Sequence, residues 1–111
     1  MAAAKCWSLL IGSRRLRGRG RVFSAQDDRL VQRITAKHFP EGYTILHASG
    51  GWFDPSARKF VQEESRQVLI CSATLAVVRR WGRELGAALQ QKELLIVELG
   101  RSVELKIRGP R

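Results

Sequence analysis

The chain has 111 residues, which is enough for one domain and too few for two. Apolar residues make up 44% of it and charged residues 27%, a composition that excludes intrinsic disorder for most of the chain. Twenty Lys and Arg against ten Asp and Glu give a net charge of +10, which favours polyanionic partners such as nucleic acid, acidic lipid or phosphorylated ligands. The alternative that stays open is a basic protein with no polyanionic partner.

The N-terminal segment begins with an apolar run. Ala4 to Ile11 predicts a buried strand that ends at Gly12. Residues 13–22 follow as a basic loop, because glycine and like charge disfavour a regular element there. The arginines of this loop are Arg14, Arg15, Arg17, Arg19 and Arg21. Residues 1–26 contain no acidic residue, so an organelle transit peptide is the alternative interpretation of this segment.

The first helix is predicted to begin after Ser24. Ser24 is a good N-cap, and Asp27, three residues further on, completes a capping box. Apolar side chains then recur at helical spacing. The helix is expected to end near His38 or Phe39, because Pro40 restricts the residue before it.

A long hairpin is predicted to follow this helix. Residues 43–49 are rich in strand formers, and the pair Gly50-Gly51 after them predicts a β-bulge or a close approach of the backbone. Residues 54–58, with a proline in a suitable position, form the turn. Residues 59–71 are expected to form the return strand, which completes the hairpin.

The C-terminal third predicts a helix and a strand. Ser72 or Thr74 can cap the helix, and its apolar stripe consists of Leu75, Val78, Trp81 or Gly82, Leu85 and Leu89. Arg79, Arg80 and Arg83 fall outside that stripe and are expected to face outward. Residues 94–99 predict a further strand, and 100–102 a turn or bulge. Residues 103–107 would form a short fifth strand, and residues 108–111 a frayed tail.

The order β-α-β-β-α-β, with right-handed crossovers, predicts an α+β fold of the ferredoxin-like sandwich type. We expect one domain over residues 1–111, with both helices on one face of an antiparallel sheet. The other face would be exposed unless it is polar or covered by another subunit. A homo-oligomer is therefore the expected state.

Two cysteines, Cys6 and Cys71, lie in apolar runs and are not part of a metal-binding pattern. They are predicted to be buried, reduced thiols that act as small hydrophobes. This interpretation favours a reducing, cytoplasmic location. No stretch approaches the roughly 18 apolar residues that cross a bilayer, so no membrane span is expected.

The middle of the chain carries three motifs that occur together. They are Phe39-Pro40-Glu41-Gly42-Tyr43-Thr44, then Gly50-Gly51-Trp52, then Glu63-Glu64-Ser65-Arg66 before an apolar strand. This pattern resembles a family of small, mostly bacterial proteins known only as a domain of unknown function. The resemblance covers residues 6–72 and supports the fold more than any activity. The arginines between Arg15 and Arg21 depart from the family pattern, which puts a shared ligand in doubt.

The element order and the long hairpin also resemble the PII signalling and divalent-cation-tolerance proteins. That resemblance implies subunits that assemble and small ligands that bind between them. It is an analogy of fold, and a fold alone does not establish a function.

Candidate chemistry is sparse. His38 and His47 have no further ligand at metal-binding spacing, and a cation at a helix end already explains His38. Neighbouring strands of the hairpin would let Ser65, Glu63 and His47 approach one another, but no catalytic signature accompanies them. A polar cross-strand network is the simpler interpretation. Neither a metal nor a cofactor is predicted.

Three functions follow from these residues. The first is an oligomeric binding domain for a small anionic ligand or a protein partner, which uses Arg14, Arg15, Gly51, Trp52, Glu63, Ser65 and Arg66. The second is a protein that grips nucleic-acid phosphates through the loop arginines Arg14, Arg15, Arg17, Arg19 and Arg21 and through Arg79, Arg80 and Arg83. The third is a small enzyme with Glu63 or His47 as a base.

Overall fold

The computed structural model describes residues 5–13, 23–91 and 94–102. The elements are β1 (Lys5–Gly12), α1 (Ala25–His38), β2 (Thr44–Asp54), β3 (Lys59–Cys71), α2 (Leu75–Ala88) and β4 (Leu95–Arg101). The basic loop from Arg14 onward, the expected strand over 103–107 and the expected tail over 108–111 lie outside the described residues. So does half of the segment 1–26, for which a transit peptide is the alternative interpretation. No helix in the described ranges is long and apolar enough to cross a membrane.

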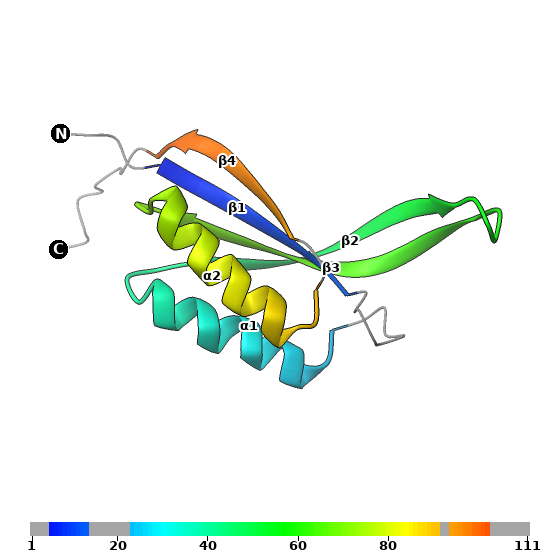
Figure 1. The fold of residues 1–111 in the computed structure, drawn as a ribbon, viewed down its shortest axis with the longest axis horizontal. Helices are drawn as coiled ribbons and strands as arrows, with labels where there is room; N and C mark the ends of the chain where they lie inside the picture. Colours follow the sequence, from blue (N-terminus) through cyan, green and yellow to red (C-terminus); the bar gives the residue numbers. More distant parts are fainter. Residues whose placement is uncertain (1–4, 14–22, 92–93, 103–111) are drawn as a thin grey trace, which may run out of the picture.

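The four strands form one antiparallel sheet in the order β2-β3-β1-β4, and both helices lie on one of its faces (Figure 1). The central strands β1 and β3 pair from Cys6↔Cys71 to Gly12↔Ser65. This topology confirms the ferredoxin-like α+β prediction. It leaves β2 and β4 as the two edges of the sheet within the described residues.

Helix α1 begins where the sequence predicts. The side chain of Ser24 accepts a hydrogen bond from the N–H of Asp27, and the carboxylate of Asp27 accepts one from the N–H of Ser24. This reciprocal pair satisfies two amides that the helix leaves without partners. The helix ends at His38, and the N–H of Phe39 donates to the carbonyl of Thr35.

The core lies between the helices and the sheet. Trp81 of α2 is completely buried; its Nε1 donates to Oγ1 of Thr35, 3.1 Å away, and its ring meets the ring of Phe39 edge to face at 5.1 Å. The remaining buried apolar side chains come from both helices and the two central strands. They include Trp7, Leu9, Ile11, Val31, Ile34, Val68, Ile70, Val78, Leu85 and Leu89. Leu75, expected in the apolar stripe of α2, is 40% exposed at the start of the helix.

The hairpin of β2 and β3 extends well beyond the two helices (Figure 1). Its register is continuous from Thr44↔Leu69 to Asp54↔Lys59. The bulge predicted at Gly50-Gly51 is therefore wrong. Neither glycine adopts a positive φ, and both keep the regular ladder opposite Glu63 and Gln62.

A β-bulge does occur near the end of β4. The register between β1 and β4 shifts between Cys6 and Trp7, where Gly100 has a φ of 92°. Only glycine adopts that backbone conformation without strain. The expectation of a turn or bulge over 100–102 is confirmed, and the strand continues to Arg101.

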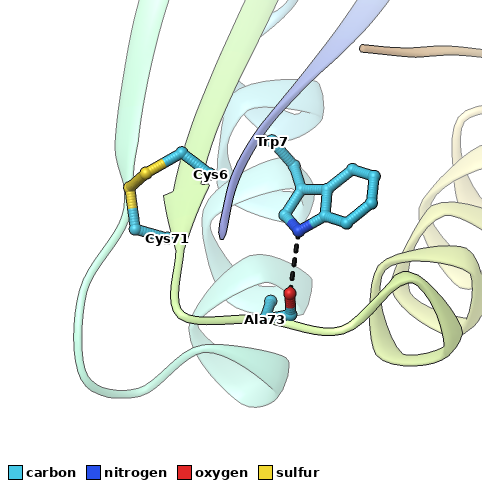
Figure 2. Close-up of a disulfide and its surroundings, with 4 residues drawn as sticks. All are labelled: Cys6, Trp7, Cys71 and Ala73. Carbon is cyan, nitrogen blue, oxygen red and sulfur yellow. Dashed lines mark hydrogen bonds between the residues drawn. A yellow bond between two sulfur atoms is a disulfide. The ribbon is translucent and has the colours of Figure 1, made fainter. Parts of the chain in front are cut away.

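Cys6 and Cys71 form a disulfide between β1 and β3, on the side of β1 opposite to Trp7 (Figure 2). The prediction of two buried, reduced thiols is wrong, because these residues are direct cross-strand partners and Cys71 is exposed. The argument for a reducing, cytoplasmic location loses its premise. On the other side of the strand, Nε1 of Trp7 donates to the carbonyl of Ala73 at 2.8 Å.

Glu84 of α2 ties the two helices together. One carboxylate oxygen accepts from Nζ of Lys37 at 2.9 Å, and the other lies 2.9 Å from Nε2 of His38. The hydrogen bond from His38, followed by that from Lys37, lowers the pKa of Glu84 below its ordinary value of 4.5.

Glu84→Gln is expected to flatten the loss of stability at acid pH. Because the folded state lowers the pKa of Glu84, this carboxylate stabilises the fold above its unfolded pKa. That contribution is lost as the pH falls through the lower folded-state pKa. Urea unfolding at a series of pH values below about 5 measures the effect. Glu41→Gln, at an exposed carboxylate, is the control; equal acid profiles for both variants and the parent would contradict the assignment.

Candidate functional site

Arg66 is the centre of a polar cluster between the sheet and α1. Its side chain is only 5% exposed. Nε donates to Oδ1 of Asp28 at 2.8 Å, and Nη2 reaches Oδ2 of Asp28 at 3.3 Å and Oε2 of Glu64 at 3.5 Å. The guanidinium also lies 4.3 Å from the centre of the Phe23 ring, close enough for a cation–π contact. The hydrogen bond with Asp28 raises the pKa of Arg66, which keeps it charged.

Glu64 connects this cluster to the segment before α1. Its Oε2 accepts from the N–H of Phe23 at 3.1 Å, and its backbone carbonyl accepts from the N–H of Ser13, also at 3.1 Å. The hydroxyl of Ser13 is buried and has no hydrogen-bond partner among the residues that the structure describes. A shallow hollow of 410 Å³ lies beside the cluster. It is lined by Phe23, His47, Ala48, Ser49, Glu64 and Arg66.

The predicted ligand residues do not converge. Successive residues of a strand face opposite sides of the sheet, so Arg66 points to the helices while Ser65 and Glu63 point to the other face. Trp52 lies on the same side as Glu63, further along the hairpin, where it pairs with the buried Val61. Gly51 is opposite Gln62. The loop residues Arg14 and Arg15 lie outside the described residues.

Glu63 and Ser65 mark one end of the sheet face that carries no helix. A Cβ placed on Gly12 would lie only 3.2 Å from Oε1 of Glu63, so the carboxylate of Glu63 rests against the backbone of β1. Ser65 pairs with Gly12 on one side and with Ala48 on the other. This corner therefore combines a carboxylate and a hydroxyl with small neighbours.

The rest of this helix-free face carries mostly apolar side chains, and we call it the open sheet face. Two rows of cross-strand neighbours cover it: Leu46, Gln67, Leu10 and Leu95, then Thr44, Leu69, Ser8 and Val97. Leu46, Leu95 and Val97 are 42%, 58% and 36% exposed. We expected a second subunit on this face from the sequence but assigned none of these residues to an interface, although the continuous apolar run 68–70 indicated a strand with apolar residues on both faces.

The residues proposed for nucleic-acid binding and for catalysis do not form a single site among the described residues either. Arg79, Arg80 and Arg83 are exposed on α2, as expected. Among the described residues, no acidic group forms an ion pair with any of the three. The nucleic-acid hypothesis also names the loop arginines Arg17, Arg19 and Arg21, which lie outside the described residues. For the enzyme hypothesis, His47 is on the helix side of the sheet, opposite to Glu63 and Ser65.

Solved structures share this fold. A phage SAM lyase in complex with S-methyl-5'-thioadenosine matches with a TM-score of 0.62 and 15% identity, over 91% of this chain and 85% of that chain. The periplasmic divalent cation tolerance protein CutA from Archaeoglobus fulgidus matches with a TM-score of 0.55 and 10% identity, over 93% and 88%. The GlnK–ATP complex from B. subtilis matches with a TM-score of 0.52 and 11% identity, over 86% and 84%. At these identities the similarity shows the fold alone.

The likeness to PII and divalent-cation-tolerance proteins is thus confirmed at the level of fold. No curated protein matches the chain. Residues 7–92 match the family described as "Protein of unknown function (DUF3574)". This match spans well over half of the chain, and it confirms the resemblance that the central motifs indicated. The chain is therefore a member of the DUF3574 family.

Proposed function

We propose that this protein is a homo-oligomeric binding domain whose subunits meet through the open sheet face. The observation that carries the proposal is the exposure of Leu46, Leu95 and Val97 on a face without helices. Exposed apolar side chains on one face of a sheet are typical of interaction sites. An antiparallel sheet that faced water would instead carry polar side chains there.

The polar groups of this face support the same interpretation. Nε2 of Gln67 donates to the hydroxyl of Ser8 at 2.9 Å, and Ser8 is only 2% exposed. This hydrogen bond pairs the two side chains within a single subunit. A second subunit could therefore cover them with less desolvation cost than two unpaired polar groups would impose.

For the ligand, we propose a small anion that carries hydrogen-bond donors, bound at the Glu63 and Ser65 corner of the open sheet face. Arg14 and Arg15 follow Ser13 in the sequence, and Ser13 is hydrogen-bonded to the backbone of Glu64. Their guanidinium groups suit an anionic group. Glu63 makes no ion pair with a described residue, so its carboxylate is available to accept from ligand hydroxyl or amino groups.

Leu95→Asp is expected to weaken self-association by about 30-fold or more, equivalent to about 2 kcal/mol, because it buries a carboxylate in an apolar interface. Sedimentation velocity over a concentration series measures the change. Leu75→Asp is the matched control, since Leu75 is also exposed but lies on α2. Equal dissociation by both substitutions, or by neither, would contradict the assignment of the interface.

A further inference from the structure

A groove of 460 Å³ runs between α2 and the edge strand β4, away from the open sheet face. Its floor is apolar and is formed by Leu94 and Ile96. A Cβ added to Gly82 would lie 3.6 Å from Cδ1 of Ile96, and one added to Gly86 would lie 3.4 Å from Cδ1 of Leu94. The two glycines, one helical turn apart, let α2 approach β4 closely. We call this feature the α2–β4 groove.

One side of the groove is formed by Leu94 and by Ile96 of the edge strand β4. Within the described residues, β4 pairs with β1 and with no other strand, and its bulge lies only at its end, near Gly100. No described residue pairs with the backbone N–H and C=O groups on the outer side of β4, and these groups can accept another strand. An unprotected edge of this type is a template for strand addition.

The opposite wall is basic. Arg79 and Arg83 line the groove, and both are exposed without an ion-pair partner in the described part of the chain. Four helical residues rise about 6 Å along the helix axis. Two strand residues span about 6.7 Å. Carboxylates at alternate positions of an extended peptide therefore have nearly the same spacing as the two guanidinium groups.

We propose that the α2–β4 groove binds an extended acidic segment of a partner protein, which adds as a fifth strand to β4. Backbone hydrogen bonds to the edge would supply affinity, and acidic side chains at alternate positions would pair with Arg79 and Arg83. The apolar floor and the strand edge favour a peptide over nucleic acid, because phosphates would use the arginines alone.

The test uses a fluorescent peptide of about nine residues with alternating Val and Glu, titrated against the full chain by anisotropy. Arg79→Ala/Arg83→Ala is expected to weaken its binding by about tenfold, while Arg33→Ala, at an exposed arginine of α1, leaves it unchanged. A peptide methylated at alternate backbone nitrogens is expected to bind much more weakly, because it cannot complete the ladder.

Four outcomes would overturn the proposal. The first is that the Val and Glu peptide does not bind, and the second is that an alternating Val and Lys peptide binds equally well. The third is that the methylated peptide binds as tightly as the unmethylated one. The fourth is that a single-stranded DNA binds with the same affinity as the peptide and loses that binding in the arginine variant. Sedimentation velocity of the arginine variant tests whether a second copy of this chain occupies the groove instead. A lower subunit number there would assign the groove to a second copy of this chain and also overturn the proposal.

Discussion

Replacing both cysteines, as Cys6→Ser/Cys71→Ser, is expected to lower the free energy of unfolding by about 4 kcal/mol. The disulfide joins residues 65 positions apart, so it removes much of the conformational entropy of the unfolded chain. It also lies where β1 begins and β3 ends. There the N–H of Ser72 donates a hydrogen bond to the carbonyl of Lys5, and Nε1 of Trp7 donates one to the carbonyl of Ala73 (Figure 2).

Guanidinium unfolding with and without dithiothreitol measures this contribution. The reductant is expected to shift the parent midpoint toward that of the double variant and to leave the variant itself unchanged. An identical midpoint for the parent under both conditions, with free thiols confirmed by mass, would contradict a stabilising disulfide. A reductant effect on the double variant would show that the measurement reports something other than this bond.

Arg66→Ala is expected to destabilise the fold by about 3 kcal/mol. The substitution leaves the carboxylates of Asp28 and Glu64 near one another without their shared cation. It also removes the contact with Phe23. Asp28 and Glu64 are 35% and 40% exposed, so water reaches both carboxylates. The expected loss of stability is therefore near the lower end of the range for breaking a buried ion pair.

Urea unfolding of Arg66→Ala, Asp28→Ala and the double variant isolates the coupling between the two side chains. We expect a coupling energy of about 1–2 kcal/mol, and additive effects would contradict the ion pair. Arg33→Ala is the exposed arginine control. The same experiment gives the temperatures at which Arg66→Ala remains folded. Only at those temperatures does a loss of ligand binding by this variant report on a ligand contact.

Local signals in the sequence were sufficient to predict the fold. The Ser24 and Asp27 capping box, Pro40 after the first helix, and the apolar stripe of the second helix each act over a few residues. The return strand of the hairpin was predicted with its observed bounds, Lys59–Cys71. The bulge at Gly50-Gly51 failed because a glycine pair permits a bulge but does not require one.

The disulfide and the candidate site depend on register, which local patterns do not fix. Cys6 meets Cys71 only because β1 and β3 pair antiparallel in one register. Strand alternation, in contrast, already separates Ser65 from Arg66, and it could have divided the predicted ligand residues between two faces. The sequence placed Asp28, the main partner of Arg66, in the first turn of α1, but nothing in it predicted the ion pair with Arg66.

The central claim is that subunits assemble through the open sheet face, and native mass spectrometry of the untagged protein at low salt tests it most directly. The account predicts a discrete homo-oligomer that carries a small bound mass, and a Leu95→Asp variant that appears as a monomer. A parent protein that is monomeric at micromolar concentration would contradict the account.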